Sequence, residues 1–416
     1  MRSFNPTIDA NFQEYVDLQL RRNGLLSGGK EQDPEFDSVE DKMADLWEKL
    51  DDIQRQSVNG MGSDLNWMRR KGQLGPKSHS PAKVTQDERK DLVTARQSSD
   101  WHGLLHYLRI CAPAMSAANL AYLRGQAYDA LDLPSYSVNF YELAADLEPT
   151  NASMGLIAMQ AVARVDPARG LARSEHVVAS YLRFPPAVVA MSTANLLRRD
   201  DVEGRPIDKR YYRRILEDTI QRINLEPLSM AEQAMVYQLA AGGFESINDL
   251  PSALKCYEDG LRLAPNNEVL LIGKGLLLYG TQTEQAVAAF RRVVSNEGTP
   301  LVWPYLFLAH YNLLQKDYDD SLQMAQLAWP RAKKDAIKAD LLEWQAICLS
   351  EAGNPPELVR PWFEKALSLD PSNDRIKRNF QAFEGALFAG RERSWDIKSE
   401  DMLRVEIANL DLLAAA

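Results

Sequence analysis

Two glycines and a lysine near the N-terminus have the spacing of a phosphate-binding loop. Gly24, Gly29 and Lys30 fit the pattern G-x-x-x-x-G-K, in which backbone N–H groups and the lysine hold phosphates. The next residue is Glu31, where magnesium needs a hydroxyl, and a charged helix rather than a buried strand precedes the pattern. We therefore expect a plain loop and no nucleotide here.

Two histidines four residues apart have a spacing that can place two imidazoles on one metal ion. His102 and His106 share one predicted helix, but no glutamate lies between them and no third ligand is evident. His79, His176 and His310 are isolated in the sequence. We expect histidines of a helix surface or core, no metal site and no cofactor.

The sequence offers no recognisable catalytic constellation. Its many serines and carboxylates do not lie in a G-x-S-x-G turn or a comparable setting at the end of a strand. We expect these polar residues to lie on solvent-exposed faces of helices. Cys111, Cys256 and Cys348 lie far apart in apolar helical stretches, which is typical of buried free thiols in a reducing compartment. We expect a protein that is not an enzyme.

Basic residues interleaved with tyrosines form a candidate nucleic-acid patch. Arginine and tyrosine together can track phosphates and stack on bases. Tyr211, Ile215 and Leu216 of the same stretch also fit the buried stripe of one helix, which would leave the arginines in water. The patch consists of Arg205, Lys209, Arg210, Arg213 and Arg214.

The overall charge opposes general binding to nucleic acid or to an anionic membrane. The formal net charge is −10 at pH 7, whereas both partners need a positive surface. No stretch approaches the roughly 18 consecutive apolar residues of a membrane span, and the charged N-terminus lacks the features of a secretory signal. We expect a soluble, cytoplasmic protein.

A set of small residues, aromatic residues and a proline recurs along the chain. The first copy consists of Gly125, Tyr128, Tyr141, Ala144 and Pro149. A second copy at one constant offset consists of Ala241, Phe244, Tyr257, Gly260 and Pro265, and its second half returns as Phe363, Ala366 and Pro371. Small residues allow helices to approach closely, aromatic rings fill the gaps and proline stops the second helix. The unit is a helical hairpin of about 34 residues.

The sequence segments that contain these copies carry a family resemblance. They read LAYLRGQAYDALDLPSYSVNFYELAADLEP and YQLAAGGFESINDLPSALKCYEDGLRLAP, with VRPWFEKALSLDP as a partial third. The chain resembles a tetratricopeptide repeat (TPR) protein, most clearly at residues 118–150, 234–296 and 340–372. The resemblance implies an all-α fold, a superhelix (solenoid) of about seven TPR-like hairpins with an N-terminal helical extension.

Composition and punctuation divide the chain into three parts. Residues 1–85 form a helical extension that includes a helix ending at Asn23-Gly24 and a Gly-, Pro-, Ser- and Lys-rich linker. Residues 86–390 form the repeat array with its capping helix, and residues 391–416 form a tail helix.

The resemblance also indicates a binding surface. In TPR arrays the first helix of each hairpin lines a concave groove, which suits a peptide or a helix of another protein. The alternative is that several of these side chains are simply core between repeats. The positions implied are Asn119, Tyr122, Gln126, Gln238, Ile272, Leu276, Trp303, Leu306, His310 and Trp344.

The function that we expect is a non-catalytic scaffold or adaptor that holds a segment of another protein in this groove. Two alternatives remain open. The chain is a recruitment or sensor subunit of a larger assembly, docking through residues 1–85 around Trp47 and Trp67, or a helical repeat that binds RNA or DNA through residues 205–214.

Overall fold

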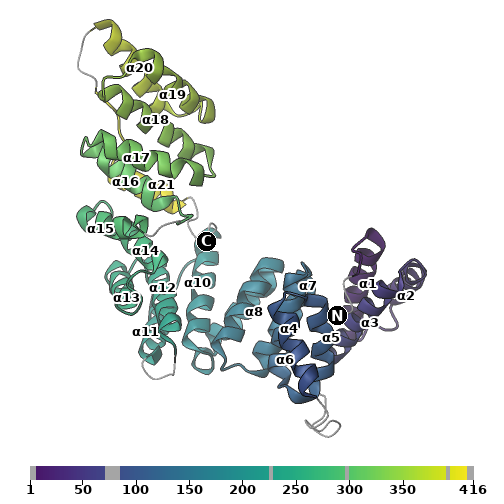
Figure 1. Ribbon diagram of the computed structural model, residues 1–416. Coiled ribbons are helices and arrows are strands. Elements are labelled where there is room, and N and C mark those ends of the chain that lie inside the picture. The colour runs from purple at the N-terminus through teal and green to yellow at the C-terminus, as the bar shows by residue number, and fades with distance from the viewer. Residues whose placement is uncertain (1–5, 71–84, 224–227, 296–298, 390–393, 410–416) are drawn as a thin grey trace. The chain divides into compact units, whose positions relative to one another are not determined.

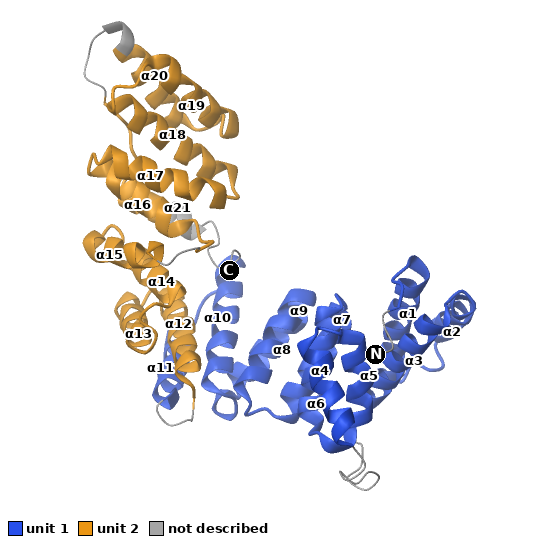
Figure 2. Cartoon of the chain, viewed as in Figure 1, with its two compact units in different colours: residues 1–225 blue, residues 226–416 orange. Residues whose placement is uncertain are grey.

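The computed structural model describes residues 6–70, 85–223, 228–295, 299–389 and 394–409. Helices joined by turns make up this part of the chain, which contains no β-strand. The chain divides into two compact units, unit 1 at Met1–Leu225 and unit 2 at Glu226–Ala416 (Figure 2). Each unit contains its own array of helices.

Unit 1 begins with three helices and continues with helix pairs that pack in sequence order (Figure 1). Its helices are α1 (Ala10–Ser27), α2 (Pro34–Trp47), α3 (Asp52–Arg69), α4 (Gln86–Gln97), α5 (Trp101–Cys111), α6 (Ala117–Ala130), α7 (Pro134–Leu147), α8 (Ala152–Val165), α9 (Pro167–Ala179), α10 (Pro186–Val202) and α11 (Lys209–Ile223).

The hairpin of α6 and α7 shows why the repeated residues are needed. A Cβ atom added to Gly125 would lie 2.6 Å from the Tyr141 ring, so only glycine allows this approach of the two helices. The Tyr128 ring is fully buried and stacks on Phe140, with 5.3 Å between the ring centroids. The roles predicted for the glycine and the tyrosine are confirmed.

The first three helices share one hydrophobic cluster with helices α4 to α8. At its centre the Asp64 carboxylate of α3, which has no exposed surface, pairs with Arg109 of α5 and Arg124 of α6. Removing a carboxylate and a guanidinium from water is costly unless they pair, so this contact fixes α3 against both helices. Residues 71–84, where the sequence places most of the linker, lie outside the described residues.

The predicted end of the first helix at Asn23-Gly24 is wrong. Helix α1 continues to Ser27 because Asn23 and Leu25 are buried against neighbouring helices, and this burial outweighs the weak helix propensity of Gly24. The turn follows at Gly28 and at Gly29, which has a left-handed φ of 67°. Gly24 therefore lies inside a helix and not in a phosphate-binding loop.

Unit 2 consists of four hairpins, one further helix and a C-terminal element (Figure 1). Its helices are α12 (Met230–Ser246), α13 (Leu250–Leu263), α14 (Glu268–Leu278), α15 (Thr283–Val294), α16 (Trp303–Leu314), α17 (Tyr318–Ala328), α18 (Asp335–Glu351), α19 (Pro356–Leu369), α20 (Asp374–Ala389) and α21 (Glu400–Asn409). In the described residues, helices α4 to α19 form eight consecutive pairs, four in each unit, in agreement with the prediction of about seven hairpins.

A residue with left-handed backbone marks the turn within the best-formed hairpins. In unit 2 these residues are Asn248, Gly280, Lys316 and Gly353, and Asp132 has the same place between α6 and α7. At four of the five turns, all except that of Gly280, the following residue donates its N–H to the carbonyl five positions earlier, which ends the first helix and reverses the chain. The short turns make the two helices of each pair antiparallel neighbours.

No helix in the described part of the chain is both long enough and apolar enough to cross a membrane. The three cysteines are free and buried, as their apolar surroundings predict.

Candidate functional site

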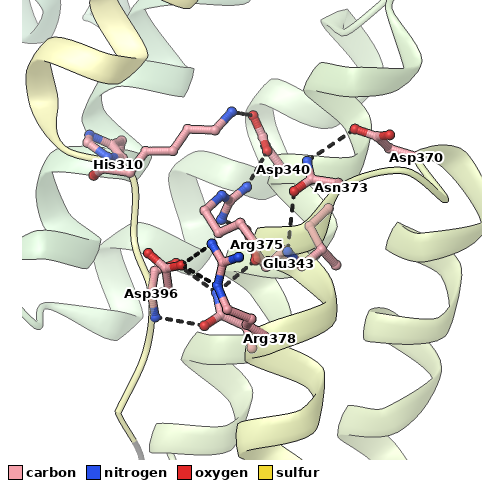
Figure 3. Close-up of polar contacts among 11 residues, drawn as sticks. His310, Asp340, Glu343, Asp370, Asn373, Arg375, Arg378 and Asp396 are labelled. Carbon is pink, nitrogen blue, oxygen red and sulfur yellow. Dashed lines mark hydrogen bonds and ion pairs between the residues drawn. The ribbon is translucent and has the colours of Figure 1, made fainter.

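The candidate site in unit 2 is a place where three helices hold a non-helical stretch of the chain. Residues 394–404, the C-terminal segment, have no regular secondary structure up to Ser399 and then enter α21. They contact residues of α20, α18 and α16, the last of which is the first helix of its hairpin (Figure 3). Asp401 then lies beside Gly280, in the turn after α14. We call the residues of α16, α18 and α20 that form this contact the acceptor surface: His310, Asp340, Glu343, Arg375, Arg378 and Asn379.

Asn379 of α20 holds the backbone of the segment with both ends of its side-chain amide. Its Oδ1 accepts from the Asp396 N–H at 2.7 Å, and its Nδ2 donates to the Asp396 carbonyl at 2.8 Å. Nδ2 also donates to Glu343 of α18 at 2.8 Å, which fixes the orientation of the amide. Asn379 therefore binds the main chain of Asp396 and not its side chain.

His310 of α16 makes a second contact with the backbone of the segment. Its Nε2 lies 2.8 Å from the Lys398 carbonyl oxygen, which can only accept, so Nε2 carries the proton. Nδ1 must then accept, and the Tyr279 hydroxyl donates to it at 2.8 Å. Burial lowers the pKa of His310 to about 4, and the neutral imidazole that results is the form that both hydrogen bonds require.

Four buried charged side chains meet at the middle of the segment, three from the helices (Figure 3) and one from the segment itself. Arg375 of α20 lies between Asp340 and Glu343 of α18, 2.6 Å from Asp340, and the Lys398 ammonium of the segment lies 2.6 Å from the other Asp340 oxygen. Burial raises the pKa of Glu343 to about 7 against the opposing effect of Arg375. When all four are ionised their charges cancel, and Lys398 supplies one of the two positive charges.

Both ends of the segment make further contacts. The Trp395 ring stacks on Phe363 of α19 at 6.1 Å between centroids and donates its Nε1 hydrogen to Glu351 at 2.9 Å. Arg378 of α20 pairs with the exposed Asp396 carboxylate at 2.6 Å. Beyond Lys398, the side chain of Leu403 is buried in the hydrophobic cluster of unit 2. The segment is therefore bound by backbone, charged and apolar contacts together.

The ten residues predicted to line the groove fall into an accessible and a buried group. Asn119 is exposed on α6 beside the partly buried Tyr122 and Gln126, and the Gln126 amide donates to the Tyr122 hydroxyl at 3.2 Å. In unit 2, Gln238 and Leu276 are partly buried. The buried group consists of Ile272, Trp303, Leu306, His310 and Trp344.

The buried group packs between helices and presents no open surface, and among these five His310 also contacts the C-terminal segment. The residues of the acceptor surface that the sequence prediction did not include are Asp340, Glu343, Arg375, Arg378 and Asn379. One signal was present, because Asp340 and Glu343 are carboxylates three positions apart in the otherwise apolar run ADLLEWQAICL.

The basic patch lies on and before α11, with all five of its predicted residues exposed. Arg205 pairs with Glu203 at 2.5 Å, and Arg214 lies 3.8 Å from Asp218. The buried stripe that was predicted to include Tyr211 instead contains Tyr212, because Tyr212 faces Asp200 of α10 and donates to it at 3.3 Å. Acidic neighbours thus offset part of the positive charge.

The aromatic residues of the N-terminal helices have different surroundings. Trp67 is buried, and the Arg124 guanidinium lies 4.5 Å from its ring centroid. Trp47 is partly buried and lines a cavity of about 460 Å³ formed by α1, α2 and α3. Of these two tryptophans, Trp47 is therefore the one that a partner can reach.

His102 and His106 lie on α5 beside Arg109, where they line a cavity of about 30 Å³. Burial lowers the pKa of both imidazoles, with Arg109 acting in the same direction. Within the described residues, no group of three His, Cys, Asp or Glu side chains has the arrangement of a metal site.

Comparisons with known proteins concern the fold. No protein-family model matches the chain, and no curated protein matches it. Similar solved structures include a TPR protein from Parabacteroides merdae, at 11% identity and a TM-score of 0.40, covering 62% of this chain and 98% of that one. A human IFIT1 dimer with PPP-AAAA matches at 12% identity and a TM-score of 0.43, covering 94% of this chain and 89% of that one.

A chain of the APC/C hetero-tetramer Cut9-Hcn1 is also similar, at 15% identity and a TM-score of 0.30, covering 90% of this chain and 83% of that one. The all-α array of helical hairpins that the resemblance to TPR proteins implies is confirmed by the order and pairing of the helices in this chain. At these identities and TM-scores, the similarities carry no argument about what the chain binds.

Proposed function

We propose that this protein is a non-catalytic scaffold that binds an extended segment of another protein on the acceptor surface of unit 2. The observation that carries the proposal is the pair of hydrogen bonds between the Asn379 amide and the backbone N–H and carbonyl of Asp396. An extended chain needs partners for its backbone groups because it has no helical ladder of its own. The acceptor surface supplies such partners, and main-chain groups are common to all proteins.

The acceptor surface is well suited to binding because its side chains are already fixed. Asn379 is held by Glu343, and His310 is held by Tyr279. Binding to groups that are already ordered avoids about 0.5–1.5 kcal/mol for each side chain that would otherwise have to be immobilised. A rigid helical array can therefore select a segment without reorganising.

A peptide-display selection tests this function. The full chain is immobilised, both unchanged and with Trp395→Ala and Lys398→Ala together, and a library of random 12-residue peptides is enriched on it. We expect peptides that bind and that lose at least 10-fold in affinity when Asn379→Ala is added. The matched control is Asn266→Ala, an exposed asparagine outside the acceptor surface, which should leave affinity unchanged. Enrichment of no peptide, or of peptides insensitive to Asn379→Ala, would contradict the proposal.

A further inference from the structure

We propose that the C-terminal segment occupies the site of the partner, and that the partner presents the same chemistry: an extended stretch with an aromatic, an acidic, an aliphatic and a basic residue in succession. In this chain these positions are Trp395, Asp396, Ile397 and Lys398. The inference rests on the proposed function. It adds the chemical class of the partner and a competition between that partner and the chain's own segment.

The basic position follows from the charge of the acceptor surface. With the segment in place, Asp340, Glu343 and Arg375 are buried, and their two carboxylates and one guanidinium carry a net charge of −1 when all are ionised. A buried charge that lacks a partner is unfavourable, so this place selects a segment that brings a cation. Lys398 reaches the Asp340 oxygen that Arg375 does not bond, at 2.6 Å.

The acidic position lies two residues before the lysine. Arg378 of α20 holds the Asp396 carboxylate through Nε at 3.0 Å and Nη2 at 2.6 Å. Lysine and aspartate therefore meet groups of opposite charge on neighbouring helices. A segment with these two charges exchanged would meet repulsion at both, so the order of the charges sets the direction in which a segment lies.

The apolar positions flank the acidic one. Trp395 stacks on Phe363, and Ile397 packs against the hydrophobic cluster of unit 2. Both side chains remain partly accessible. They add apolar contact without sealing the segment into the core.

Most side chains of the segment remain accessible. Across residues 394–404, Lys398 and Leu403 are the buried side chains, and the others are exposed or partly exposed. The pair between Arg378 and Asp396 lies in solvent, where ion pairs contribute little. A segment with so few buried side chains can be displaced by another that offers the same groups.

Competition has a defined consequence for binding in trans. A segment in the same chain acts at an effective concentration in the millimolar range for short connections. An external partner binds only the fraction of molecules whose acceptor surface is open, so its apparent Kd rises by the inverse of that fraction. Weakening the internal segment while leaving the acceptor surface intact should therefore strengthen binding of the external one.

The test uses the full-length chain and a fluorescein-labelled peptide of sequence SWDIKSEDMLR, which copies residues 394–404. Fluorescence anisotropy compares the wild-type chain with the double variant Trp395→Ala, Lys398→Ala. We expect the double variant to bind the peptide at least 10-fold more tightly than wild type. In the double variant, the added substitution Asn379→Ala should reduce peptide affinity at least 10-fold, and so should an alanine in place of the peptide's lysine.

Circular dichroism and thermal unfolding establish that each variant is folded. If the double variant unfolds, Lys398→Gln removes only the charge and keeps Trp395, and a smaller increase of at least threefold in peptide affinity is expected. Equal affinity of wild type and folded variant overturns the inference, as does a folded variant that does not bind the peptide. If the inference fails in this way, the peptide-display selection decides the proposed function. Selected peptides that depend on Asn379 but lack the aromatic, acidic, aliphatic and basic order would still support a scaffold. Selection of no peptide that depends on Asn379 would contradict the proposed function as well as the inference.

Discussion

The Tyr128 hydroxyl donates a 2.7 Å hydrogen bond to Oδ2 of Asp64, although the two residues are 64 positions apart. Burial, with Asp64 as a further cause, raises the pKa of Tyr128 well above its usual value, so the hydroxyl remains the donor. The same carboxylate meets Arg109 at 2.7 Å and Arg124 at 3.0 Å. One side chain of α3 thus joins α5 and α6.

The first prediction concerns this carboxylate. Asp64→Asn removes the negative charge that offsets two buried or partly buried guanidinium groups, and breaking a buried ion pair in this way costs about 3–5 kcal/mol. Chemical denaturation should show this loss for unit 1. The matched variant Asp129→Asn disrupts the accessible pair with Arg164 and should cost at most about 1 kcal/mol. Equal losses for the two variants would contradict the role assigned to Asp64.

The second prediction compares two helical glycines of unit 1. Gly125→Ala places a methyl group 2.6 Å from the Tyr141 ring, and such overpacking costs about 1–3 kcal/mol. Gly24→Ala places its methyl group where no atom lies within 4 Å, and alanine in a helix gains about 0.5–1 kcal/mol over glycine. Thermal unfolding should therefore move in opposite directions for the two variants. A stabilising Gly125→Ala would show that the helices can separate without loss.

The third prediction concerns His310 and the loss of stability of unit 2 at acidic pH. Burial lowers its pKa from the usual 6.5 to about 4 in the folded protein. A base with a lowered folded pKa contributes stability that is fully present above pH 6.5 and is lost as pH falls through about 4. Urea denaturation of unit 2 between pH 7 and pH 4 should show this decline, and His310→Gln should flatten it.

The control for His310 is the exposed His176 of unit 1, since His176→Gln should leave the transition of unit 2 unchanged. An equally steep decline in the His310→Gln chain would mean that other groups cause it.

The fourth prediction concerns Glu245, whose contribution to stability falls as pH rises rather than as pH falls. Burial raises its pKa from 4.5 to about 7, although the Tyr257 hydroxyl donates to it at 2.7 Å and favours the charged form. A carboxyl with a raised folded pKa contributes stability that is fully present below pH 4.5 and is lost as pH rises through about 7. Glu245→Gln should therefore make unit 2 more stable relative to wild type at pH 8 than at pH 4.5.

Tyr257→Phe supplies the companion measurement for Glu245. Loss of the hydroxyl removes the bond that favours the carboxylate, so the decline in stability should extend to higher pH. A decline that shifts to lower pH in this variant would contradict the assignment.

The hairpins could be predicted because their signals are local. Gly125 faces Tyr141 and Tyr128 stacks on Phe140 within one pair of helices, so the residues that make each contact lie close together in the sequence. The end of α1 could not be predicted in this way, since burial of Leu25 depends on helices that are distant in the sequence.

The acceptor surface was harder to predict for two reasons. Helix α18 is buried on almost every side, so no periodic stripe separates core positions such as Trp344 from contact positions such as Asp340. His310 meets Lys398 across 88 positions, and Asn379 meets Asp396 across 17. Neither pairing has a signal in one sequence, because the helical period describes faces and not their occupants.

The left-handed turn residues of unit 2 also make the array adjustable in length. Asn248, Gly280, Lys316 and Gly353 each lie between the two helices of a hairpin, although the turn of Gly280 has a different hydrogen bond, so a gene fragment from one of these codons to the next encodes the equivalent of one repeat. Duplication or loss of such a fragment would keep every remaining turn intact and change the number of hairpins by one. Recombination at these four codons is thus a route by which the array can grow or shrink in whole steps.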